Sequence, residues 1–90
     1  MIDPDQLDAV NAQLDRLDRH GGRAWTRATL RLIDKYPGVS VAALARQAKR
    51  DRGDMLRDIR RLDELGVIVR TGTGHRLSDL GQAVVHPKAD

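Results

Sequence analysis

The chain has 90 residues, of which 40% are hydrophobic and 32% are charged, and its net charge is +3. A chain of this length forms one domain with one modest core, which excludes a second lobe for sensing a metabolite. No apolar run is long enough to span a membrane, and the acidic amino terminus lacks the basic region and apolar stretch of a signal peptide. The absence of cysteine excludes disulfides, thiolate zinc sites and cysteine nucleophiles. We therefore expect a cytoplasmic protein.

The charge is unevenly distributed along the chain. Residues 1–20 contain two arginines and five aspartates, a net −3, whereas residues 21–90 contain 14 basic and eight acidic residues, a net +6. A basic body of this size is typical of proteins that bind nucleic acid. A solvated charged surface explains the same balance equally well, so charge alone does not decide the function.

The first predicted helix covers about residues 4–19, because Asp3 and Pro4 are typical of a first helical turn. Its apolar residues follow the 3-4-3 spacing of a heptad seam: Leu7, Val10, Leu14 and Leu17. Two heptads are too few for a stable isolated coiled coil, so this stripe is buried either against the rest of the domain or against a second copy. Gly21-Gly22 ends the helix and separates an amino-terminal helix, 1–20, from a domain at 21–86 and a tail at 87–90.

The second predicted helix runs from Arg23 to Tyr36, where Pro37-Gly38 stops it. Apolar positions at helical spacing predict one buried face, made of Trp25, Ala28, Thr29, Leu32, Ile33 and Tyr36. We therefore expect the two aromatic residues to pack in the core and not to stack on bases. Another side of this helix carries a basic stripe at i, i+4 spacing: Arg23, Arg27, Arg31 and Lys35. This stripe is either solvated or in contact with phosphates or with the acidic first helix.

Two more helices and a hairpin follow. Ser40 is a good N-cap for a short helix that ends at Ala48, and Asp51 caps a longer helix up to Leu65, with Gly66 after it. The core face of this longer helix is predicted to be Met55, Leu56, Ile59 and Leu62. A strand at 67–70, a tight turn at 71–74 and a return strand at 75–77 then form a hairpin, and Ser78 caps a last helix at 79–85.

Two short helices joined by a very short turn, the second rich in arginine, are typical of a DNA-binding helix-turn-helix. The side of the second helix that faces away from the core is predicted to carry Gly53, Arg57, Arg60, Arg61 and Glu64. An arginine fork can bind guanine or clamp phosphate, and Gly53 lets the backbone approach the groove floor. Asp54 either caps the helix or accepts a hydrogen bond from the amine of a cytosine. Glu64 opposes phosphate binding, whereas Asp58 and Asp63 are expected off this side.

The run VSVAALARQAKRDRGDMLRDIRRLDELGVIVRTGTGHRLSDLGQAVV, residues 39–85, resembles the winged helix-turn-helix core of bacterial regulators of the MarR, ArsR and related families. The segment LDELGVIV followed by RLSDLGQ carries most of this resemblance. It implies a mainly α fold with a small β-hairpin wing. It also implies a recognition helix that meets the major groove through Arg52, Gly53, Asp54, Arg57 and Arg61, and a wing that contacts DNA through Arg70, Thr73, His75 and Arg76. The wing is short, which favours phosphate contacts over insertion into the minor groove.

Other kinds of site find little support in the sequence. The three histidines lie far apart without a carboxylate cluster, so we expect no metal, and we also expect no cofactor and no small-molecule ligand. No nucleophile, base and oxyanion donor can be assembled, so we expect no enzyme. The predicted function is sequence-specific binding of double-stranded DNA by a homodimeric transcriptional regulator that pairs through Leu7, Val10, Leu14 and Leu17. The alternative is a winged-helix adaptor that binds protein, and the outward arginines favour DNA.

Overall fold

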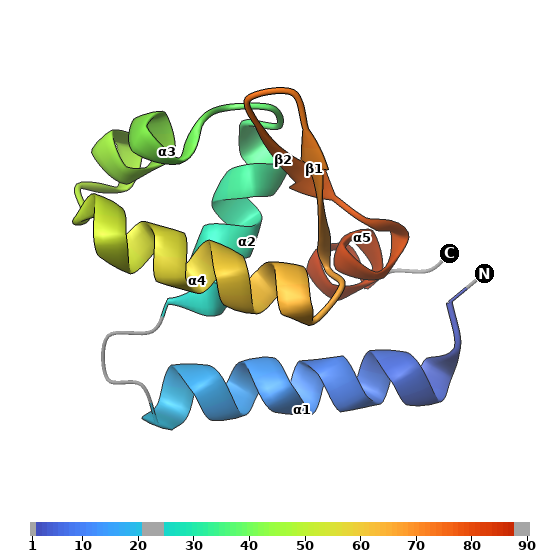
Figure 1. Cartoon of the computed structure of the whole chain (residues 1–90). Coiled ribbons are helices and arrows are strands. Elements are labelled where there is room, and N and C mark those ends of the chain that lie inside the picture. The colour runs from blue at the N-terminus through green and yellow to red at the C-terminus, as the bar shows by residue number, and fades with distance from the viewer. Residues whose placement is uncertain (1, 21–24, 88–90) are drawn as a thin grey trace.

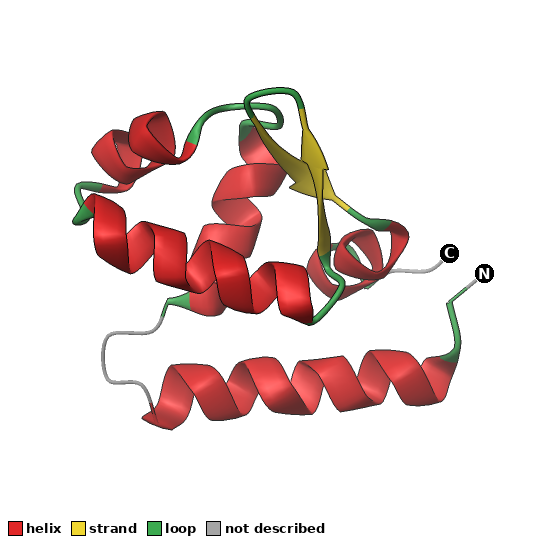
Figure 2. Cartoon of the chain, in the orientation of Figure 1, coloured by secondary structure: helices red, strands yellow, loops and turns green. Residues whose placement is uncertain are grey.

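The computed structural model describes residues 2–20 and 25–87, and in these residues it contains five helices and one antiparallel hairpin (Figures 1 and 2). The elements in chain order are α1 (Pro4–His20), α2 (Thr26–Lys35), α3 (Val41–Ala48), α4 (Arg52–Glu64), β1 (Ile68–Thr71), β2 (Gly74–Leu77) and α5 (Asp79–Val85). The predicted mainly α fold with a small hairpin is confirmed. The proposed boundary at Gly21-Gly22 and the last three residues of the tail lie outside the described residues. Within that part of the chain, no helix has both the length and the apolar character needed to cross a membrane.

One core joins all the elements except the hairpin turn. In Figure 1, α2, α3 and α4 surround it with the hairpin at one end, and α1 runs along one side of the molecule. The buried apolar residues are Val10, Leu14, Leu30, Ile33, Leu44, Ala45, Met55, Ile59, Leu62, Val67, Ile68, Leu77 and Leu80. A buried side chain of this kind contributes about 1.5–3 kcal/mol to stability, so the domain depends on nearly every one of them.

The apolar stripe of α1 belongs to this core. Leu14 has no exposed surface, Val10 is buried, and Leu7 and Leu17 are half-buried, because α1 packs against α2 and α5 of the same chain. Of the two alternatives for this stripe, burial within the domain is the observed one. Of the stripe predicted as a dimer seam (Leu7, Val10, Leu14 and Leu17), Val10 and Leu14 are therefore used within the core of one chain, and Leu7 and Leu17 keep part of their surface.

Polar contacts also fasten α1 to α2. The Asp18 carboxylate accepts hydrogen bonds from the Thr26 backbone N–H at 2.8 Å and from the Thr26 hydroxyl at 2.6 Å, so it caps α2 from a neighbouring helix. Arg27 forms an ion pair with Asp15 at 2.8 Å and also donates to Asn11. The expected contact between the basic stripe and the acidic first helix is thus confirmed for Arg27; Arg23 lies outside the described residues.

The buried face of α2 differs from the predicted one. The residues that face the core are Thr26, Thr29, Leu30 and Ile33, whereas Ala28 is exposed and Trp25 is 48% exposed. The prediction of a buried Trp25 is wrong. The helix is rotated by about one residue because two threonines face inward, where Asp18 and Asp58 accept hydrogen bonds from their hydroxyls.

The helix-turn-helix forms as its capping residues predict. The Ser40 hydroxyl accepts from the Ala43 N–H at 3.2 Å, and the Asp51 carboxylate accepts from the Gly53 and Asp54 N–H groups at 2.9 and 3.2 Å. Between the two helices, Lys49 adopts a left-handed conformation with φ 56°, which turns the chain sharply. Side-chain caps of this kind each stabilise a helix by about 1 kcal/mol.

The hairpin is anchored to the loop between α2 and α3. Its strands pair from Ile68↔Leu77 to Thr71↔Gly74, one residue later than predicted at the first strand. The Gly38 N–H donates to the His75 carbonyl at 2.8 Å, and the Thr73 hydroxyl donates to the Gly38 carbonyl at 3.2 Å. A Cβ at Gly74 would lie 2.3 Å from the Val39 carbonyl oxygen, so only glycine permits this approach. The hairpin therefore has a fixed position relative to the helices.

Candidate nucleic-acid interface

The helix α4 presents a basic surface to solvent. Its buried side consists of Met55, Asp58, Ile59 and Leu62. The exposed residues of α4 define its outward face: Arg52, Gly53, Arg57, Arg60, Asp63 and Glu64. The structure thus brings together most of the residues that the sequence assigns to a recognition helix.

The arginines of α4 differ in their surroundings. Arg57, whose side chain is 63% exposed, pairs with Asp54 at 3.0 Å, one helical turn earlier. Arg61 is only 37% exposed and lies 4.0 Å from the buried Asp58 carboxylate, so it belongs to the edge of the outward face and not to its centre. Among the described residues, no ion pair engages Arg52 or Arg60. These two guanidinium groups are consequently the ones most open to an anionic partner.

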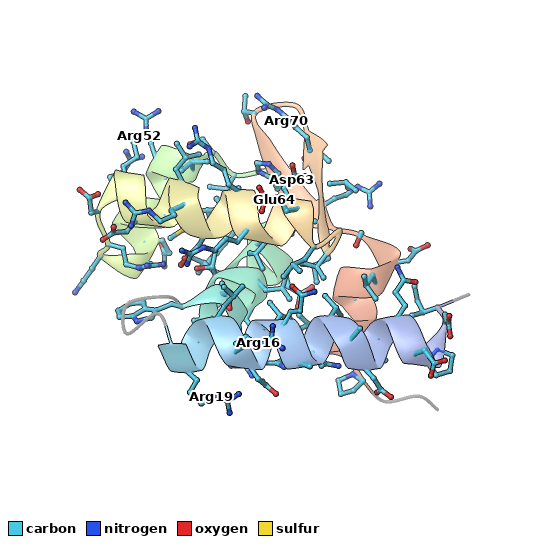
Figure 3. The ribbon with its side chains drawn as sticks, turned by 60° about the horizontal axis from the view of Figure 1, so that its bottom comes forward. Arg16, Arg19, Arg52, Asp63, Glu64 and Arg70 are labelled. Carbon is cyan, nitrogen blue, oxygen red and sulfur yellow. The ribbon has the colours of Figure 1, made fainter. Side chains whose placement is uncertain are left out.

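The carboxyl-terminal end of α4 is acidic. Figure 3 shows Arg52 and Arg70 on the same side of the molecule, across from α1, with Asp63 and Glu64 beside the hairpin. Asp63 is exposed and lines the groove next to the hairpin, so it lies closer to the candidate interface than predicted. Asp58 is buried, which confirms that it lies off the outward face. The outward face therefore changes from basic at the amino-terminal end of α4 to acidic at the other.

A groove of about 330 Å³ separates α4 from the hairpin. Its lining residues are Val41, Leu56, Ile59, Arg60, Asp63, Arg70, Thr73 and His75. Leu56, predicted in the core, is only half-buried because it forms part of the groove floor. Arg60 and Arg70 approach from opposite walls and Asp63 adds a carboxylate, so the groove combines an apolar floor with two positive groups and one negative group.

His75 is a neutral member of this groove. Burial lowers the pKa of its imidazole below the usual 6.5, and the charge of Arg70 lowers it further, whereas Asp63 acts in the opposite direction. Its Nδ1 atom is buried and has no hydrogen-bond partner among the described residues. At neutral pH the imidazole can therefore offer a hydrogen bond to a partner but no positive charge.

The hairpin places its two arginines on opposite faces. In the register of the two strands, Arg70 lies opposite His75, and Arg76 lies opposite Val69. Because side chains alternate along a strand, Arg70 points with His75 toward the groove and Arg76 points away from it. The Thr73 hydroxyl is already bonded to Gly38. Of the four predicted wing residues, the structure therefore brings Arg70, Thr73 and His75 to the α4 groove and does not bring Arg76 there.

A buried polar network behind α4 was missed at the sequence level. Arg50 and Asp58 form an ion pair at 2.7 Å, with their side chains only 6% and 3% exposed. The Asp58 carboxylate also accepts from the Trp25 N–H, and the Arg50 guanidinium lies 4.5 Å from the centre of the Trp25 ring. This network connects α2, the turn between α3 and α4, and α4 itself. A signal was present, since Asp58 stands at core-facing helical spacing from Met55 and Leu62.

No group of three or more histidine, aspartate and glutamate side chains suited to a metal ion occurs in the residues that the structure describes. His86, one of the three histidines considered for such a site, pairs with Asp34 at 2.9 Å. This contact holds the end of α5 to α2.

A family model described as HVO_A0114 matches residues 25–78, which is more than half of the chain. The chain belongs to the HVO_A0114 family. The matched HVO_A0114 segment comprises α2, α3, α4 and the hairpin, and it includes the outward face of α4, the groove and the Arg50–Asp58 pair. No curated protein and no solved structure matches the chain.

Proposed function

We propose that this protein is a homodimeric transcriptional regulator that binds double-stranded DNA in a sequence-specific manner and catalyses no reaction. The observation that carries the proposal is the row of exposed arginines on α4 beside a groove whose other wall carries Arg70. The resemblance of residues 39–85 to winged helix-turn-helix regulators supports it. Such a regulator acts in the cytoplasm, at the nucleoid.

In this proposal α4 is the recognition helix. Its outward face enters the major groove, where Arg57 and Arg60 offer bidentate forks to guanine or to phosphate. Arg57 exchanges Asp54 for this partner, at little cost because an exposed ion pair contributes only about 0–1 kcal/mol. Gly53 has no side chain to hold the helix away from the DNA. The acidic residues Asp63 and Glu64 lie at the far end of the helix, and Asp63, which lines the groove beside Arg60 and Arg70, opposes phosphate binding there.

The hairpin acts as the wing and contacts the DNA backbone. Arg70 and Arg60 stand on the two walls of the groove and bind neighbouring phosphates, while His75 offers a neutral hydrogen bond. The hydrogen bonds from Thr73 and Gly38 hold the hairpin against the body of the domain, which favours surface contact over insertion into the minor groove. Arg76, on the opposite face, contributes little in this account.

Selection from a random pool of DNA duplexes tests the proposal. Fluorescence anisotropy at low and at physiological salt gives the affinity, and sequencing of the bound fraction gives the preferred site. We expect binding that weakens steeply with salt and an enriched palindromic sequence, because phosphate neutralisation dominates affinity and two recognition helices read two half-sites. A protein that does not bind the pool even at low salt is not a DNA-binding regulator, and the adaptor function would then replace this proposal.

A further inference from the structure

An apolar groove lies between α2 and the turn that joins α3 to α4. It measures about 230 Å³, and we call it the Trp25 groove; its lining residues are Trp25, Ala28, Thr29, Leu32, Ala48 and Arg50. Trp25 is the large apolar side chain that the described residues leave exposed, and Ala28 is exposed beside it. A cluster of apolar groups around a hollow differs from a single exposed apolar residue, and it is typical of an interaction site.

The helix α2 has more apolar residues than the core of one chain uses. Its buried side passes through Leu30 and Ile33, whereas Trp25, Ala28 and Leu32 follow a second helical stripe, at i, i+3 and i+7. The core packs against the first stripe and leaves most of the second at the surface. The amphipathic pattern of α2 is therefore only partly satisfied within one chain.

The tryptophan is held in place before any partner arrives. The Arg50 guanidinium lies 4.5 Å from the ring centre, and Asp58 fixes Arg50 through the buried ion pair at 2.7 Å. Asp58 also accepts from the backbone N–H of Trp25. A rigid aromatic side chain loses little conformational entropy on binding, and tryptophan is prominent among the residues that dominate interface energies.

The charges around the Trp25 groove have both signs. A second hollow of about 220 Å³ shares Trp25 and Arg50 with it, and its other lining residues are Lys49, Asp51 and Asp54. In a contact between two identical chains related by a two-fold axis, each residue meets its partner reciprocally, so an effective interface carries complementary charges on one patch. Lys49 beside Asp51 meets this requirement, whereas an acidic peptide or DNA would be matched by a rim of positive charges alone.

We infer that the Trp25 groove is the contact through which two copies of this chain associate. Trp25 of each copy covers Ala28 and Leu32 of the other, and Lys49 of each copy faces Asp51 of the other. The inference rests on the proposed function for the need of two recognition helices. It also explains how a dimer forms although the α1 stripe is buried within each chain.

The single tryptophan of the chain gives a direct readout of this contact. Sedimentation velocity is measured over a range of protein concentrations together with tryptophan emission and its quenching by acrylamide. We expect the conversion from monomer to dimer to coincide with a blue shift of the emission and with reduced quenching, because burial removes the indole from water. A chain that stays monomeric, or a dimer whose tryptophan emission does not change, would overturn the inference.

Two variants test whether the contact between the two copies lies at the Trp25 groove. Ala28→Glu introduces a charge at an exposed position of α2 without disturbing the core, and we expect the dimer to weaken at least about tenfold. Lys49→Asp, at a left-handed position that aspartate tolerates, should also weaken it by placing like charges opposite each other. The matched control is Ala12→Glu, at an exposed alanine of α1, which should leave the dimer unchanged. Circular dichroism confirms that each variant is folded.

Equal dimer affinities for Ala28→Glu and Ala12→Glu would contradict the proposed contact. Failure of the proposed function gives a different result, because it appears as a tryptophan-dependent dimer that does not bind DNA. Conversely, a monomer that binds DNA contradicts the Trp25 contact and leaves the DNA-binding proposal intact.

Discussion

Asp58 links three parts of the molecule through one carboxylate. It accepts from Arg50 at 2.7 Å and from the Trp25 N–H at 3.3 Å, and Arg61 approaches its other oxygen at 4.0 Å. A buried charge is tolerated only where such partners replace water. The position of α4 relative to α2 therefore depends on this side chain, and the proposed DNA contacts depend on that position.

Replacing Asp58 should destabilise the fold strongly. Asp58→Ala leaves the Arg50 guanidinium buried without its carboxylate, and breaking a buried ion pair in this way costs about 3–5 kcal/mol. The matched control is Asp15→Ala, which removes an aspartate from the more exposed pair with Arg27 and should cost at most about 1 kcal/mol. Urea unfolding followed by circular dichroism measures both. Equal losses of stability would show that the buried pair contributes no more than a surface one.

His75 should make stability depend on pH. Its pKa in the folded protein is lowered below 6.5, so between the two pKa values the unfolded chain binds more protons than the folded one. The free energy of unfolding should therefore decrease as the pH falls from about 6.5 through the folded pKa. His75→Gln, which keeps a polar side chain without this titration, should flatten that part of the profile. An identical pH profile for both proteins would exclude His75 as the source.

At the level of the helices, capping residues and hydrophobic periodicity predicted much of the fold. Ser40, Asp51 and Ser78 all cap helices as expected, since these short-range hydrogen bonds need only neighbouring residues. The rotation of α2 was not predictable in this way. Its sequence fits two overlapping apolar faces, and the choice between them depends on hydrogen bonds to Asp18 and Asp58, which lie in other helices, α1 and α4.

The candidate site also combines features that the sequence predicts with features that it does not predict. A helical wheel places Arg57 and Arg60 on the outward face, because the core side of a helix fixes the opposite side. The partial shielding of Arg61, the position of Asp63 in the groove and the outward turn of Arg76 depend on the packing of other elements and on strand register. None of these follows from the sequence of one element alone.

Leu14 tests the role of α1 as an integral part of the domain. A charge at this fully buried position, as in Leu14→Asp, should unfold the chain and not release a folded monomer. The milder Leu14→Ala should lower the free energy of unfolding by about 2–5 kcal/mol, as expected for a core leucine. Thermal unfolding and sedimentation measure the two effects. A stable, folded monomer of Leu14→Asp would show instead that α1 contributes an interface and not the core.

Across the whole molecule, charge is separated in space as it is in sequence. Residues 1–20, a segment that includes α1, carry a net −3, while the remainder of the chain carries +6. In Figure 3, α1 lies across from Arg52 and Arg70. Part of the basic charge is neutralised where Arg27 meets Asp15. Arg52 and Arg70 lie on the side away from α1. In the proposed function, this polarity orients the domain toward DNA, which is a polyanion.

The most direct test of this account compares two double variants with equal changes in charge. Arg57→Ala with Arg60→Ala alters the outward face of α4, and Arg16→Ala with Arg19→Ala alters exposed arginines of α1. Binding to the selected duplex is measured by anisotropy between about 50 and about 200 mM salt. We predict that the α4 variant loses about 1–3 kcal/mol per base-reading arginine, or about one unit of salt slope per phosphate contact, and that the α1 variant retains its affinity. Equal losses of affinity in the two variants would contradict the account, because the affinity for DNA would then depend on the net charge of the protein and not on α4.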